Sequence, residues 1–101
     1  MDRLALVALS ATKDDYESVQ SVGSEIGKFL GRAVTEQELL SVFRSLEDAG
    51  FVEAYREADG GLVPTRSSEK DLPEHLWFLA TAKGREVVDR DWQQVFGARS
   101  E

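Results

Sequence analysis

The most regular hydrophobic pattern of the chain lies in residues 35–50. Its apolar positions are three or four residues apart, which places them on one face of a helix: Leu39, Val42, Phe43, Leu46 and Ala49. Thr35 and Glu38 precede this run with the spacing of a capping box, in which each side chain accepts a hydrogen bond from the backbone N–H of the other residue. Gly50 supplies the left-handed residue that ends such a helix. The pattern therefore predicts a capped, amphipathic helix.

Helical spacing recurs at both ends of the chain. Residues 1–13 carry apolar side chains over a wide arc, which predicts a largely buried first helix with Asp2 at its start. A short buried strand is the alternative, because so brief an apolar run has no distinctive period. Near the other end, the apolar positions of residues 81–96 form one stripe, and Thr81 is suited to cap it. We therefore expect a first and a last helix.

A further helix is expected over residues 15–31, where most apolar side chains again lie three or four positions apart. Asp14 or Asp15 offers its cap. Gly23 and Gly27 each weaken such a helix by up to about 1 kcal/mol relative to alanine. Two explanations for these glycines remain open: a close crossing of helices, or a break that divides the segment in two.

The pattern changes from helix to strand after Gly50. The next residues mix apolar and charged side chains as an extended segment does, and residues 58–61, Ala-Asp-Gly-Gly, have the composition of a hairpin turn. Pro64 confines the returning strand to a sheet edge. The apolar residues 76–79 predict a further strand beyond a polar stretch. Residues 51–80 are therefore expected to form a hairpin with a long polar connection.

Two motifs resemble a known family. Residues 46–53, Leu-Glu-Asp-Ala-Gly-Phe-Val-Glu, resemble the end of the third helix in winged helix-turn-helix proteins, with Phe43 and Leu46 at the two leucine positions. Residues 79–88, Leu-Ala-Thr-Ala-Lys-Gly-Arg-Glu-Val-Val, are similar to the segment at which MarR-like and PadR-like regulators pass from the last strand of the wing into a helix. The resemblance covers residues 24–92. The order and separation of the two motifs are more specific than either motif alone.

The resemblance implies a mainly α fold with a small antiparallel β-hairpin: a three-helix core, a wing and a C-terminal helix in one domain. It also implies a transcriptional regulator of duplex DNA whose helix from residue 35 enters the major groove. The positions carried over as base-facing are Thr35, Gln37, Ser41 and Ser45. Glu36 and Glu38 depart from the usual pattern, because they bring two carboxylates into a field of phosphates. The alternative is that this stretch is only a well-capped, solvated helix start.

The charge of the chain bears on DNA binding. The resemblance implies phosphate contacts from six basic residues: Lys28, Arg32, Arg44, Arg56, Arg66 and Lys70. Over residues 15–50 three basic residues face seven acidic ones, a difference of −4, and over residues 51–81 three face six, a difference of −3. The whole chain carries −7, whereas a DNA-binding domain ordinarily presents a basic face. The rival hypothesis is an acidic winged-helix module that binds a protein partner and no DNA.

The terminal helices offer material for self-association. Small winged-helix regulators commonly dimerise through helices outside the DNA-binding unit, so the resemblance implies a homodimer. The candidate interface residues are Leu4, Trp92, Val95 and Phe96. The alternative is that these side chains close the core of the monomer. We expect both roles, with inner edges in the core and outer edges in the dimer.

The composition argues against catalysis. The 101 residues include no Cys and one His, His75, so no thiolate or paired histidine is available as nucleophile or metal ligand. No Ser lies in a glycine-flanked nucleophile turn, and no phosphate-binding loop is present. No apolar run approaches the length of a membrane helix. We therefore expect a cytoplasmic protein that is not an enzyme, has no metal or cofactor, and does not associate with membranes.

Overall fold

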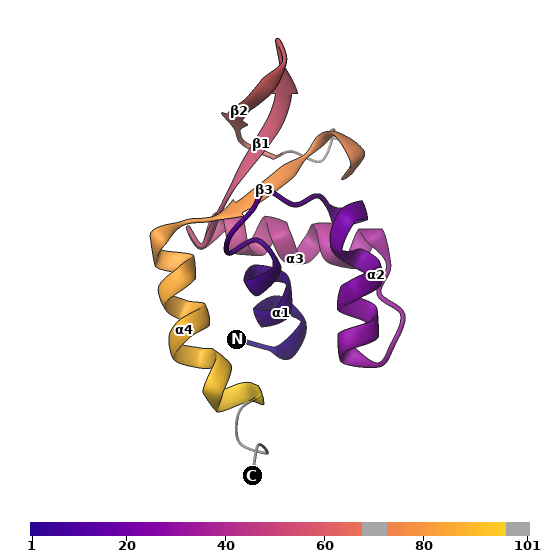
Figure 1. The fold of residues 1–101 in the computed structure, drawn as a ribbon, viewed down its shortest axis with the longest axis vertical. Helices are drawn as coiled ribbons and strands as arrows, with labels where there is room; N and C mark the ends of the chain where they lie inside the picture. The colour runs from indigo at the N-terminus through magenta and orange to yellow at the C-terminus, as the bar shows by residue number, and fades with distance from the viewer. Residues whose placement is uncertain (68–72, 97–101) are drawn as a thin grey trace.

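The computed structural model describes residues 1–67 and 73–96 (Figure 1). Its elements are α1 (Arg3–Ala11), α2 (Val19–Leu30), α3 (Glu36–Asp48), β1 (Val52–Ala58), β2 (Gly61–Thr65), the short 3-10 helix η1 (Pro73–His75), β3 (Trp77–Ala80) and α4 (Ala82–Phe96). The sheet stands at one end of the molecule, where the β1–β2 hairpin projects away from the helices (Figure 1). The predicted fold class, mainly helical with a small antiparallel hairpin, is confirmed.

Helix α1 lies at the centre of the helical part. Its N-cap is Asp2, whose carboxylate accepts a hydrogen bond from the backbone N–H of Ala5 at 2.7 Å. Four consecutive residues of the helix are buried: Leu6, Val7, Ala8 and Leu9. A helix that is apolar around most of its circumference is stable only inside a core, and α1 contacts α2, α3 and α4. The first segment is thus a buried helix and not the alternative strand.

Helix α2 begins four residues later than the sequence pattern predicts, at residue 19 instead of 15, and Ser18 replaces Asp14 or Asp15 as its cap. The residues before it pair with the sheet instead. The N–H of Glu17 donates to the carbonyl of Phe78 at 3.0 Å, and the N–H of Phe78 donates back at 2.8 Å. This pairing satisfies backbone groups on the edge of β3. A tertiary contact therefore overrides the local helical spacing.

The three strands form an antiparallel sheet in the order β2-β1-β3. Asp59 and Gly60, with φ of 52° and 83°, make the two-residue turn between β1 and β2. Pro64 lies on the edge strand β2, as predicted. The predicted hairpin turn at residues 58–61 is confirmed and closes the wing hairpin, whereas the expectation that the wing hairpin has a long polar connection is wrong. The polar connection instead joins the two outer strands, and residues 68–72 of it lie outside the described part.

One apolar core joins the sheet to the helices. The inner face of the sheet carries Val52, Ala54, Phe78 and Ala80, all buried. Phe78 of β3 stacks on Phe43 of α3, with ring centroids 4.6 Å apart and an interplanar angle of 7°. Neither ring is exposed to solvent, and burial of such a side chain contributes roughly 1.5–3 kcal/mol. The stack therefore holds α3 firmly against the sheet.

The start of α4 is fixed by a close backbone contact. The hydroxyl of Thr81 donates to the carbonyl of Gly50 at 2.7 Å and accepts from the N–H of Gly84 at 3.1 Å, so Thr81 caps the helix as predicted. A Cβ built on Gly84 would lie 2.1 Å from the carbonyl oxygen of Phe51. Only glycine permits this approach, and Gly84 lets α4 pack directly on the chain that leaves α3.

We expect Gly84→Ala to lower the free energy of unfolding by about 1–3 kcal/mol, because the added methyl group overlaps backbone atoms that cannot move independently. Gly23→Ala is the matched control, because its Cβ would lie 3.5 Å from a Leu39 methyl carbon, an ordinary contact. This second substitution should raise the free energy of unfolding by up to about 1 kcal/mol. Urea denaturation measures both, and equal effects of the two substitutions would contradict the packing role of Gly84.

Candidate nucleic-acid interface

Helices α2 and α3 form the helix-turn-helix unit, and the turn between them is tight. Helix α2 ends at Gly31, which has a left-handed φ of 76°. A Cβ built on Gly27 would lie 2.9 Å from the carbonyl oxygen of Arg32, so the returning chain passes directly over the last turn of α2. Gly27 therefore serves the turn, which corrects both explanations expected for it, a helix crossing and a break in the segment.

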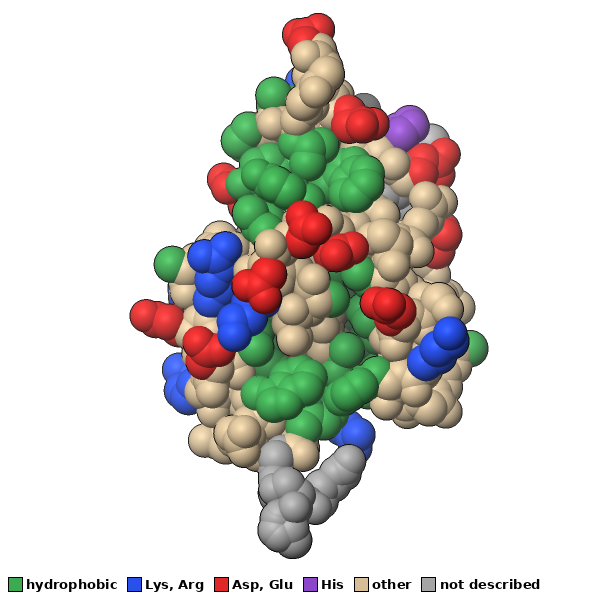
Figure 2. Space-filling view, viewed as in Figure 1, with side chains coloured by type: hydrophobic (Ala, Val, Ile, Leu, Met, Phe, Trp, Pro, Cys, Tyr) green, Lys and Arg blue, Asp and Glu red, His purple; other side chains and the backbone are tan. Residues whose placement is uncertain are grey.

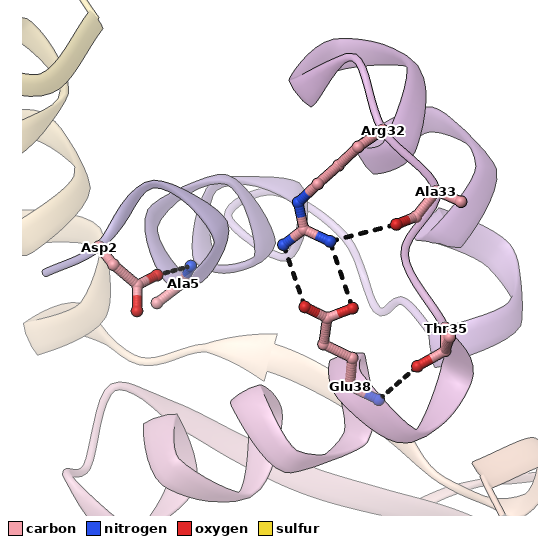
Figure 3. Close-up of polar contacts among 6 residues, drawn as sticks. All are labelled: Asp2, Ala5, Arg32, Ala33, Thr35 and Glu38. Carbon is pink, nitrogen blue, oxygen red and sulfur yellow. Dashed lines mark hydrogen bonds and ion pairs between the residues drawn. The ribbon is translucent and has the colours of Figure 1, made fainter.

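The N-terminus of α3 carries a paired acid and base (Figure 3). The Thr35 hydroxyl accepts from the N–H of Glu38 at 3.0 Å, as the capping box requires. The Glu38 carboxylate, however, accepts two hydrogen bonds from the Arg32 guanidinium, at 3.0 and 3.3 Å. It therefore completes an ion pair with the preceding turn in place of the reciprocal cap. The predicted capping box is half correct.

A complete capping box is present in α2, where the sequence pattern did not indicate one. The Ser18 hydroxyl accepts from the N–H of Ser21 at 3.1 Å, and the Ser21 hydroxyl accepts from the N–H of Ser18 at 2.9 Å. A serine thus takes the position at which glutamate or glutamine is usual. The hydroxyl of Ser21 also donates to the Glu17 carboxylate at 2.7 Å, which links the cap to the residue that pairs with the sheet.

The ion pair between Arg32 and Glu38 shifts the pKa of both side chains. The hydrogen bond from Arg32 lowers the pKa of Glu38 below its ordinary value, with the positive charge of Arg32 and the cap at Thr35 acting in the same direction. Glu38 in turn raises the pKa of Arg32. Both side chains remain partly exposed, so solvent screens the attraction. The pair is thus accessible to a competing anion.

The four base-facing candidates, Thr35, Gln37, Ser41 and Ser45, are all exposed on α3. Ser41 and Ser45 line a shallow hollow between α3 and the N-terminal end of α1, together with Asp2 and Ala5. The Asp2 carboxylate is engaged in the α1 cap, yet its charge stands beside the two serines. Thr35 and Gln37 lie a turn or more away, at the N-terminus of the helix.

The six phosphate candidates lie in different environments. Lys28 is exposed in the last turn of α2, and Arg56 is exposed on β1. Arg44 is half-buried on α3. Arg66, at the base of the wing, pairs with Asp48 at the C-terminal end of α3 at 3.4 Å. Lys70 lies outside the described residues.

Two residues that sequence reasoning missed position this surface. Glu47 of α3 is buried and accepts hydrogen bonds from the backbone N–H of Ser67 at 3.1 Å and from its hydroxyl. Lys83 of α4 donates to the carbonyl of Ala49 at 3.1 Å, beyond the end of α3. Glu47 follows the buried Phe43 by four residues, which places it on the same face of the helix, and this spacing was a signal that the carboxylate faces inward. These contacts hold the wing base and α4 against the end of α3.

Within residues 1–67 and 73–96, no group of three or more His, Asp or Glu side chains is placed to hold a metal ion. None of the helices in this part of the chain is long and apolar enough to cross a membrane.

No protein-family model and no curated protein sequence matches the chain. Solved structures do match it. RosR of H. salinarum superimposes with a TM-score of 0.68 at 16% identity, covering 100% of this chain and 80% of its own. A transcriptional regulator from Clostridium thermocellum gives 0.66 at 14% identity, covering 90% and 78%.

The third structure is Bacillus subtilis PadR in complex with operator DNA, with a TM-score of 0.64 at 17% identity. The match covers 91% of this chain and 47% of the PadR chain, so PadR is about twice as long. In this chain the helix-turn-helix of α2 and α3 is followed by the hairpin of β1 and β2. The chain therefore shares its fold with these solved structures, and this fold is the winged helix-turn-helix that the sequence predicted.

Proposed function

We propose that this protein is a transcriptional regulator that binds duplex DNA through α3 and the β1–β2 hairpin. The observation that supports it best is the placement of an arginine beside each end of α3. Arg32 lies against Glu38 near the N-terminal end, and Arg66 lies against Asp48 at the C-terminal end. The two carboxylates are ten residues apart in the helix, which corresponds to about 15 Å. A major groove is about 12 Å wide, so both arginines can reach its flanking phosphates.

The N-terminal end of α3 supplies the groups for base contacts in this proposal. Gln37 is exposed there and has the amide that pairs with the two hydrogen-bonding groups of adenine in the major groove. Thr35 offers a hydroxyl, although its oxygen already accepts from the helix backbone. Ser41 and Ser45 face the same side one and two turns later. Arg56 on the wing and Lys28 on α2 add phosphate contacts on either side.

The carboxylates at both ends of α3 compete with DNA for the arginines. Each phosphate must replace a carboxylate that is already in place, at Glu38 and at Asp48. The Arg66–Asp48 pair is about three-quarters exposed on both sides, so it contributes little and exchanges readily. The Arg32–Glu38 pair has two hydrogen bonds and is harder to replace. We therefore propose that Glu38 holds the affinity for DNA low, and that it reduces the salt dependence of binding by occupying an arginine that would otherwise contact a phosphate.

Self-association is proposed through an aromatic cluster formed by Phe29, Trp92 and Phe96. The ring centroids of Trp92 and Phe96 are 4.5 Å apart, and Phe29 lies 5.9 Å from Trp92 and 5.3 Å from Phe96. Phe29 is 54% exposed, which is unusual for so large an apolar side chain. Figure 2 shows apolar surface on the helical part of the molecule, in the lower half of the view.

A second copy of the chain can cover this cluster by twofold symmetry. The predicted interface residues Leu4, Trp92, Val95 and Phe96 are half-buried, with their inner sides packed on the core. Such positions suit both roles expected of them, closing the monomer and contacting a partner. We propose a homodimer that acts in the cytoplasm, where the DNA is.

Removing the Glu38 charge should strengthen DNA binding, because Arg32 becomes available to a phosphate. We expect Glu38→Gln to lower the Kd for a labelled duplex by about tenfold. The slope of log Kd against the logarithm of the salt concentration should increase by about one, the change that one additional phosphate contact produces. Arg66→Ala should weaken binding to all sequences and flatten that dependence by about the same amount. Fluorescence anisotropy, titrated at several salt concentrations, measures both.

Arg90→Ala is the matched control for these two substitutions. Arg90 is exposed on α4 and pairs with its neighbour Asp91, so its removal alters the net charge by one without touching α3. It should change the affinity much less than Arg66→Ala does. The proposal would be contradicted if the wild-type protein did not bind at low salt. It would also be contradicted if the wild type and the three variants bound equally well.

The dimer should depend on Phe29. We expect the wild-type protein to sediment at twice the mass of one chain, and Phe29→Ser to shift the equilibrium to the monomer, because a buried ring at the seam is lost. Phe29 is more than half exposed in the monomer, so the fold should survive. Tyr16→Ser, which removes an exposed ring elsewhere, should remain dimeric. A monomeric wild type, or an effect of Tyr16→Ser equal to that of Phe29→Ser, would refute this interface.

A further inference from the structure

The sheet presents a second apolar surface, which neither DNA binding nor dimerisation uses. One face of the sheet packs on α3, as the buried side chains of Ala54 and Phe78 show. Side chains alternate between faces along a strand. Tyr55 and the residues paired with it across the strands therefore lie on the opposite face. We define this outer sheet face by Tyr16, Tyr55, Leu62, Pro64, Trp77 and Leu79.

The aromatic side chains of this face lie together. Tyr55 pairs across the strands with Trp77 on one side and with Pro64 on the other. The Tyr16 ring meets the Tyr55 ring edge to face, with centroids 4.9 Å apart and an angle of 87°. Tyr16 is 38% exposed. Tyrosine and tryptophan supply large contact areas at low cost in side-chain entropy, and both are enriched at interfaces.

The orientation of Tyr55 is fixed from within the protein. Its hydroxyl donates to the Glu53 carboxylate at 2.7 Å. This hydrogen bond raises the pKa of Tyr55 to about 12, with burial and the negative charge of Glu53 acting in the same direction. The phenol therefore stays neutral at physiological pH, and its hydrogen bond to Glu53 restricts the side chain. The centre of the face is thus organised before any partner arrives.

The margin of the outer sheet face is acidic. Glu53 and Glu57 lie two residues before and two residues after Tyr55 on β1, so they are on the same face of the sheet, and both are exposed. Asp14 and Asp15 are exposed beside Tyr16. Of the residues that the three described strands place on this face, none is basic. Figure 2 shows the apolar surface in the upper half of the view, with acidic side chains around much of its edge.

The charge decides which occupant fits. Duplex DNA is excluded, because the phosphates would meet the carboxylates of this margin. A second copy of the chain is disfavoured as well, because a twofold contact would bring equal acidic margins together. A cationic protein segment is complementary: arginine stacks on tyrosine and tryptophan rings and pairs with carboxylates. Apolar residues of the same segment would cover the leucines and the proline.

We propose that the outer sheet face is a docking surface for a partner protein, and that the segment bound there carries apolar or aromatic side chains flanked by Arg or Lys. The face lies on the side of the sheet opposite α3, so the partner and DNA occupy different surfaces. The proposal therefore does not depend on DNA binding.

Selection from a phage-displayed library of random peptides tests this proposal, with the full-length protein as bait. Recovered peptides should combine apolar residues with Arg or Lys. Their Kd should rise by about tenfold or more for Tyr55→Thr and for Glu57→Lys, and it should be unchanged for Phe29→Ser, which alters the other aromatic surface. The changes in amide chemical shift caused by a recovered peptide should be concentrated in the three strands and at Tyr16. The amides of α3 should show no such changes.

Substitutions on a strand can damage the fold, so circular dichroism and thermal unfolding accompany each variant. Tyr16→Ser provides a second test, because that ring is exposed and lies outside the sheet ladder; it should weaken the same peptides. Recovery of no peptide, of peptides without basic residues, or of peptides that bind the folded variants as tightly as the wild type would overturn the proposal.

Discussion

The stack of Phe43 on Phe78 is the contact on which the rest of the structure depends. It joins α3, the proposed recognition helix, to the sheet whose hairpin forms the wing, and both rings are fully buried. Glu47 adds a polar link between the same helix and the wing base at Ser67. Because α3 and the wing are fixed relative to each other, their exposed side chains present one rigid surface. Preorganisation of this kind lowers the entropy lost on binding.

The negative charge of the protein is concentrated in particular places on this structure. An overall charge of −7 argues against DNA binding only if the acids are spread evenly. Glu38 and Asp48 instead sit beside the arginines at the two ends of α3, where they act as internal competitors for phosphate. Another part of the negative charge, including Glu53 and Glu57, lies on the far side of the sheet from α3. The acidic character is therefore divided between a surface proposed to bind DNA weakly and one proposed to bind a basic partner.

Much of the fold followed from local patterns in the sequence. The helical spacing of α3, the cap at Thr35 and the hairpin turn at Asp59 depend on neighbouring residues alone. The start of α2 was misjudged because Glu17 pairs with a strand some 60 residues further along the chain. A local pattern cannot reveal such a partner. The four base-facing candidates of α3 are exposed and Arg44 is half-buried, whereas the roles of all five in DNA binding stay predictions.

The sequence by itself determined the order of helices and strands, since each depends on spacing and turn residues within a short stretch. Only the tertiary structure decided how the charged and aromatic side chains are partnered. Glu38 could cap its own helix or pair with Arg32, and the position of the turn before α3 selected the ion pair. Likewise, the rings of Tyr16 and Tyr55 share a surface only because the chain before α2 runs along β3. Partner choice depends on distance in space, which the folded chain sets and the order of residues does not.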